Sequence, residues 1–130
     1  MRLYTELYDF SPFELGSLRI QGNKILAVIV DVEQDPPCRS EWVAQALDRI
    51  FEHAAKIRTP MLSLPLLGHC YGGLQLNTSL QLILAGLLEH KSALPARIQL
   101  RMPRTYMPEA WQVLAAAGLM ENQIYPLFRS

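Results

Sequence analysis

Residues 25–30 read Ile-Leu-Ala-Val-Ile-Val, and this apolar run decides the fold. A strand with one face in water alternates apolar and polar side chains, whereas a strand covered on both faces is apolar throughout. The run therefore predicts a strand inside a sheet. It follows Gly22-Asn23, a dipeptide that suits the positive φ angles of a tight hairpin turn, so residues 15–21 and 24–32 are expected to form an antiparallel pair.

Three helices are predicted downstream of this hairpin. Ser40 can cap a helix whose apolar residues from Val43 to Ala54 follow helical spacing. Thr78 or Ser79 can cap a second helix, which is apolar on two sides over residues 80–88 and is therefore expected to be covered by the sheet and by another element or subunit. A last helix begins near Pro108 and ends at Gly118.

Further strands are predicted between and around these helices. The alternation in residues 97–102 is typical of an outer strand rather than a central one. The other expected strands cover residues 2–8, 61–67 and 124–128. Strands that alternate with helices over short connections indicate an α/β fold, with a mixed, mostly parallel sheet in a three-layer α/β/α arrangement.

Length and charge restrict the possible partners. The chain has 130 residues, of which 18% are charged, so residues 1–130 are expected to form a single domain. Twelve Lys and Arg balance twelve Asp and Glu, which leaves no basic field for nucleic acid or anionic lipid. Glu6 and Asp9 stand where a signal peptide would be apolar. A cytoplasmic protein without nucleic-acid or membrane partners is expected.

The segment from Pro65 to Leu74 is the most informative loop. It reads Pro-Leu-Leu-Gly-His-Cys-Tyr-Gly-Gly-Leu and follows a predicted strand directly. Glycines let backbone N–H groups approach an anion closely, and the following helix adds a favourable dipole if its N-terminus points to the same place. A phosphate or diphosphate group is the ligand that this pattern favours, although a simple tight turn has the same composition.

Residues 24–88 resemble the C-terminal half of a macro domain, the ADP-ribose-binding family. The resemblance includes a strand, a helix, a strand with Ser-x-Pro at Ser63 and Pro65, and a Pro-Leu-Leu-Gly-x-x-x-Gly-Gly loop before another helix. It implies a shortened macro-like fold that binds ADP-ribose or a related nucleotide. The residues expected to contact that ligand are Gly68, His69, Cys70, Tyr71, Gly72 and Gly73, with Tyr106 stacking on the adenine ring.

The family's N-terminal half, which carries its hydrolytic residues, has no counterpart here. We therefore predict no catalytic residues and no cofactor, and the expectation leans away from an enzyme. An alternative is a non-catalytic homodimeric interaction module that has lost the ligand pocket, with the helix at residues 80–88 in the interface.

Other reactive side chains have ordinary explanations. His69 and Cys70 adjoin one another and Cys38 follows a neighbouring strand, but a small buried cysteine is commoner than a nucleophile or a metal ligand, and no metal site is predicted. His53 and His90 are interpreted as solvated residues near helix ends. The remaining candidates are Trp42 and Trp111, read as packing or interface residues, and Arg97, Arg101 and Arg104, read as a solvated strand face.

Overall fold

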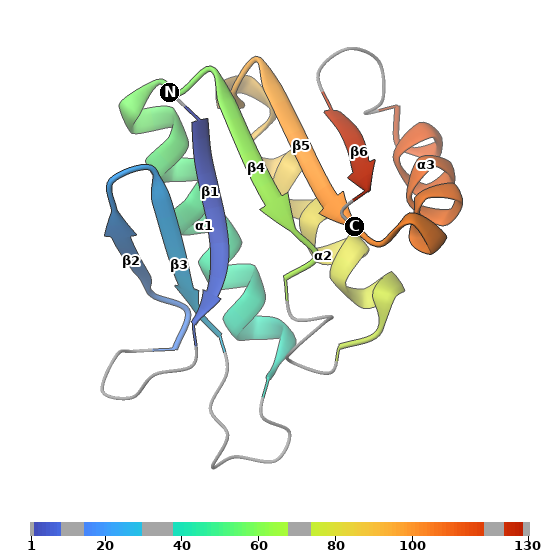
Figure 1. Ribbon diagram of the computed structural model, residues 1–130, viewed down its shortest axis with the longest axis horizontal. Helices are drawn as coiled ribbons and strands as arrows, with labels where there is room; N and C mark the ends of the chain where they lie inside the picture. The colour runs from blue at the N-terminus through green and yellow to red at the C-terminus, as the bar shows by residue number, and fades with distance from the viewer. Residues whose placement is uncertain (1, 9–14, 30–37, 68–73, 119–123, 129–130) are drawn as a thin grey trace.

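The computed structural model describes residues 2–8, 15–29, 38–67, 74–118 and 124–128 (Figure 1). Its six strands form one sheet in the order β2-β3-β1-β4-β5-β6. The strands are β1 (Arg2–Tyr8), β2 (Leu18–Gln21), β3 (Lys24–Val28), β4 (Met61–Pro65), β5 (Arg97–Met102) and β6 (Ile124–Phe128). The helices are α1 (Ser40–Ile57), α2 (Leu76–Glu89) and α3 (Met107–Ala116), with short 3₁₀ turns η1 (Lys91–Ala93) and η2 (Arg104–Tyr106). The α/β class is confirmed.

The sheet is parallel except at one edge. β1 pairs in parallel with both β3 and β4, and β4, β5 and β6 continue the parallel pairing. β2 and β3 form the predicted antiparallel hairpin, and Gly22 in its turn has a φ of 60°. This angle lies in the left-handed region that glycine adopts without steric cost, which explains the residue at this position.

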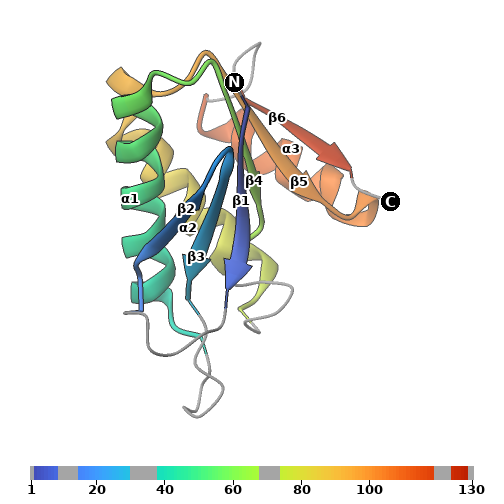
Figure 2. The same ribbon diagram turned by 60° about the vertical axis from the view of Figure 1, so that its left-hand side comes forward.

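The three helices lie on the same side of the sheet in both views (Figures 1 and 2). Each crossover, from β3 to β4, β4 to β5 and β5 to β6, moves in the same direction across the sheet. Right-handed crossovers that move in one direction place their helices on one face. The predicted three-layer arrangement is therefore not confirmed, because the described helices and the sheet make two layers.

The apolar core lies between these two layers. Alternate strand residues such as Ile25, Leu62 and Ile98 belong to one buried cluster with residues of all three helices. The intervening positions of β4 and β5 are more polar: Ser63 Oγ donates a 3.1 Å hydrogen bond to Gln99 Oε1, and both side chains are buried. In β4 and β5, polar and apolar residues therefore separate by sheet face.

This separation corrects one prediction about β5. The alternation in residues 97–102 predicted an outer strand, but β5 lies between β4 and β6. Ile98, Leu100 and Met102 belong to the core cluster beneath the helices, whereas Gln99 is on the opposite face. The alternation of apolar and polar residues therefore arises because helices cover only one face of the sheet, and it does not indicate an edge strand.

Both predicted helix caps are also wrong. α1 begins at Ser40 with Arg39 as the N-cap residue, and α2 begins at Leu76 with Gln75 as the N-cap residue. Within the described residues, no side-chain hydrogen bond caps either helix. Ser79 instead lies inside α2, where its hydroxyl bonds to another part of the chain.

The prediction that α2 is covered on two sides is confirmed only in part, because Ala85 and Leu88 are exposed. Leu80, Ile83 and Leu87 are buried in the core, while Leu82 and Leu84 are partly buried and pack against it. α2 lies between α1 and α3 and contacts both. Neighbouring helices of the same chain thus cover part of its second side. No helix of the described ranges is long and apolar enough to cross a membrane.

Gly86 permits the close approach of α1 and α2. A Cβ atom at this position would lie 2.7 Å from Cε2 of the buried Phe51 ring. We expect Gly86→Ala to destabilise the protein, because overpacking costs about 1–3 kcal/mol and outweighs the gain of about 1 kcal/mol from helix propensity. Urea unfolding followed by tryptophan fluorescence measures this change. Ala85→Gly, at the exposed neighbouring position, is the control for propensity alone; an increase in stability of Gly86→Ala would contradict the close packing.

Candidate functional site

The parallel strands bring several connections to one edge of the sheet. β1, β3, β4 and β5 all end at the lower edge in Figure 1, which we call the carboxyl edge. The chain leaves β1 toward β2 and β3 on one side and leaves β4 toward α2 and β5 on the other. Ligands of parallel α/β sheets bind outside the carboxyl ends of the strands, where neighbouring connections diverge. The candidate site therefore lies at the ends of β1 and β4.

The predicted ligand residues Gly68, His69, Cys70, Tyr71, Gly72 and Gly73 lie outside the described residues. The structure does describe both ends of this segment. Leu66 and Leu67 are buried after β4, and Leu74 is half-buried and packs against the core. The segment therefore spans two fixed points at the carboxyl edge.

A buried hydrogen bond connects these two ends. Ser79 Oγ donates to the carbonyl oxygen of Leu67 at 2.8 Å, and the Ser79 side chain is fully buried. This bond joins the first turn of α2 to the residue before the glycine-rich segment. Ser79 was predicted to cap the helix, but its hydroxyl is used to close the base of the loop.

The N-terminus of α2 faces the same edge. α2 follows the glycine-rich segment and runs from the carboxyl edge toward the opposite edge of the sheet (Figure 1). The backbone N–H groups of a first helical turn lack partners within the helix and form the positive end of its dipole. The first turn of α2 contains no acidic residue to neutralise that end. The arrangement can favour an anion held by the preceding segment.

Tyr106 lies at the carboxyl edge as well, one strand further along the sheet. It ends η2, which follows β5, and its backbone N–H donates to the Pro103 carbonyl at 3.0 Å. The side chain is half-buried and packs against the core. Tyr106 therefore lies at the same edge of the sheet as the described ends of the glycine-rich segment, and its role in stacking on a ligand stays a prediction.

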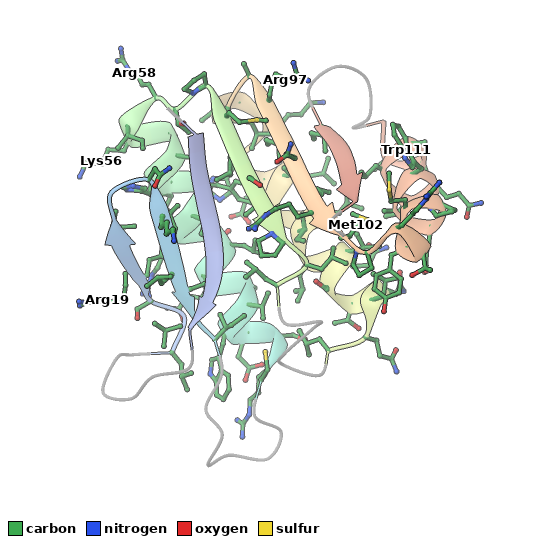
Figure 3. All side chains as sticks on the ribbon, viewed as in Figure 1. Arg19, Lys56, Arg58, Arg97, Met102 and Trp111 are labelled. Carbon is green, nitrogen blue, oxygen red and sulfur yellow. The ribbon has the colours of Figure 1, made fainter. Side chains whose placement is uncertain are left out.

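The three arginines of the β5 region do not form one site. Arg97 is exposed at the start of β5, whereas Met102 marks the opposite end of the strand (Figure 3). Arg101 is half-buried near the end of β5, and Arg104 is exposed in η2. These side chains are spread along the whole strand, so they cannot act together on a single phosphate group.

Cys38 is a buried structural residue. Its side chain belongs to the core cluster, and burial raises the pKa of its thiol to about 11. A nucleophile or metal ligand must be the thiolate, which this environment disfavours. The prediction of a small buried cysteine is confirmed at Cys38, while its suggested neighbours His69 and Cys70 fall outside the described ranges.

A group that the sequence did not indicate lies between α1 and α2. His90 Nε2 is 3.1 Å from Oδ1 of Asp48, with the ring N–H as donor, and the His90 side chain is only 18% exposed. The prediction of a solvated His90 was therefore wrong. The two residues are 42 positions apart on different elements, so no local sequence pattern could have indicated the pair.

No protein-family model matches this sequence, and no curated protein matches it significantly. The functional argument therefore depends on the site itself.

Ser79→Ala tests the closure of the loop base. We expect it to lower the free energy of unfolding by about 1–3 kcal/mol, because the buried Leu67 carbonyl loses its hydrogen-bond donor. Ser92→Ala, at an exposed serine of η1, is the matched control and should change the stability by less than about 0.5 kcal/mol. Chemical denaturation measures the free energy of unfolding of both variants. If Ser79→Ala is as stable as Ser92→Ala, the hydrogen bond contributes nothing to stability.

Cys38 should resist alkylation in the folded protein. A pKa of about 11, against the ordinary value of 9.0, lowers the thiolate population at pH 8 by about two orders of magnitude. Iodoacetamide treatment at pH 8 followed by peptide mass spectrometry should find Cys38 modified in denaturant but not in the native protein. The same shift makes the free energy of unfolding depend on pH. The unfolded chain ionises Cys38 above pH 9.0 while the folded chain keeps the thiol neutral, so the protein is most stable with respect to this group below pH 9.0 and loses stability as the pH rises toward 11. Equal alkylation rates in both states would contradict the burial.

Proposed function

We propose that this protein binds a nucleotide with a diphosphate group, such as ADP-ribose, at the carboxyl edge of its sheet. The observation that carries the proposal is the Ser79–Leu67 hydrogen bond, which closes the base of the glycine-rich segment in front of the N-terminus of α2. A loop held at both ends loses less conformational entropy when it orders around a ligand. The helix N-terminus adds a field that favours negative charge.

The resemblance to macro domains assigns roles within this site. Gly68, Tyr71, Gly72 and Gly73 would surround the diphosphate and the distal ribose, with His69 and Cys70 in the same loop. Tyr106 would stack on the adenine ring from the end of β5. The proposal is of binding without catalysis, since the part of the family's pocket that carries hydrolytic residues has no counterpart in this sequence.

The alternative of a homodimeric interaction module has less support. On the second side of α2, Leu82 and Leu84 pack against the core of the same chain, which leaves Ala85 and Leu88 exposed. Exposed large apolar side chains among the described residues are Ile20, Ile57, Leu88 and Trp111, which belong to four different elements. Because these side chains belong to separate elements, they give no support for a dimer interface over a ligand site.

Thermal unfolding with added ligands tests the proposal. ADP-ribose at about 100 times its dissociation constant should stabilise the protein by about 2.7 kcal/mol, and AMP or inorganic phosphate at the same concentration should stabilise it less. Gly72→Val should abolish this effect because its side chain prevents close approach of the backbone to a phosphate. Ala96→Val, an exposed position at the opposite edge of the sheet, is the matched control and should retain it.

The proposal fails if no nucleotide shifts the unfolding temperature, or if Gly72→Val responds as the parent protein does. Light scattering on the same samples measures the molecular mass. A dimer without any ligand response would favour the interaction module instead.

A further inference from the structure

Asp48, Glu89 and His90 place three potential metal ligands together where the end of α2 meets the middle of α1. One ligand atom of each residue lies within 4.8 Å of the other two. Within this group, His90 Nε2 and Asp48 Oδ1 are 3.1 Å apart. Two donors bound tetrahedrally to one zinc ion at about 2.0–2.2 Å are separated by roughly 3.3–3.6 Å. This pair needs to separate only slightly to share an ion.

His90 is held in position by its surroundings. Its backbone N–H donates to the Gly86 carbonyl at 3.0 Å, and its ring lies against Phe51 with the ring centroids 5.5 Å apart. The His90 side chain is 18% exposed, whereas that of Asp48 is 42% exposed and Glu89 is exposed. A fixed imidazole is thus accompanied by two carboxylates that can rotate, and Glu89 needs only a small side-chain movement to reach a common ion.

The charges at this place favour a divalent cation. Two carboxylates lie beside an imidazole nitrogen, and the C-terminus of α2 contributes the negative end of its helix dipole. The adjacent cation in the sequence, Lys91, is exposed in η1. Solvent access on this side gives an ion a path to the three ligands.

We propose that Asp48, Glu89 and His90 bind a divalent first-row metal ion, with Zn²⁺ as the expected occupant. Imidazole together with carboxylates suits Zn²⁺, whereas Mg²⁺ and Ca²⁺ prefer oxygen ligands alone. Three protein ligands leave a fourth position for water. Binding through Nε2 requires that nitrogen without a proton, so the bound ring would carry its proton on Nδ1.

The ion would join α1 to α2 in place of the hydrogen bond between His90 and Asp48. Both helices lie side by side on the same face of the sheet (Figures 1 and 2). The end of α2 is at the opposite edge of the sheet from the glycine-rich segment, so the metal site is independent of the proposed nucleotide site. The ion would bind the folded chain and not the unfolded chain, and it would therefore stabilise the fold.

Calorimetric titration of the chelator-treated 130-residue chain with ZnCl₂ tests this proposal. One equivalent of Zn²⁺ should bind, and His90→Gln and Glu89→Gln should each weaken the affinity by about tenfold or more. His53→Gln and Glu52→Gln are the matched controls, because they remove the same groups from α1 outside the proposed ligand set, and they should bind as the parent does. MgCl₂ should bind much more weakly than ZnCl₂.

Two further measurements separate metal binding from structural damage. Glu89 is exposed, so Glu89→Gln should keep the parent's unfolding temperature without metal and lose only the zinc-induced rise. Co²⁺ bound to the protein should show visible d–d bands without a thiolate charge-transfer band, since no cysteine belongs to the proposed ligand set. Unchanged zinc affinity in His90→Gln and Glu89→Gln, or a thiolate band with Co²⁺, would overturn the proposal.

Discussion

The direction of the crossover connections is the constraint on which the rest of the structure depends. From β3 onward the chain moves one way across the sheet, and right-handed connections then place α1, α2 and α3 on a single face. The main apolar core cluster forms on that face, although Leu26 and Val28 of β3 are also buried. The other face can hold polar pairs such as Ser63 and Gln99, which satisfy each other's hydrogen-bonding groups instead of packing under a helix.

The same constraint makes α1 and α2 neighbours. Their contact is close because Gly86 has no side chain where the Phe51 ring lies. Phe51 in turn lies against the ring of His90, and His90 meets Asp48. A packing requirement in the core thus positions a polar group near the surface, and this explains why potential metal ligands from α1 and the end of α2 come together.

The parallel strands separate the two proposed sites. The glycine-rich segment begins at the carboxyl edge, where Ser79 closes its base, and the three metal-ligating residues lie where α2 ends. α2 connects these places, with its positive end toward the proposed nucleotide site and its negative end toward the proposed metal site. Each end of one helix therefore favours a ligand of the opposite charge.

The sequence by itself determined the element order, the hairpin at Gly22-Asn23 and the α/β class, because apolar periodicity and turn residues act over short distances. It also identified the glycine-rich segment, although the described ranges include only the ends of that segment. Only the tertiary structure decided the number of layers, the interior place of β5, the role of Ser79 and the meeting of Asp48 with His90. Each of these depends on which elements pack together, and residues far apart in the chain carry no local signal of the partners they will meet.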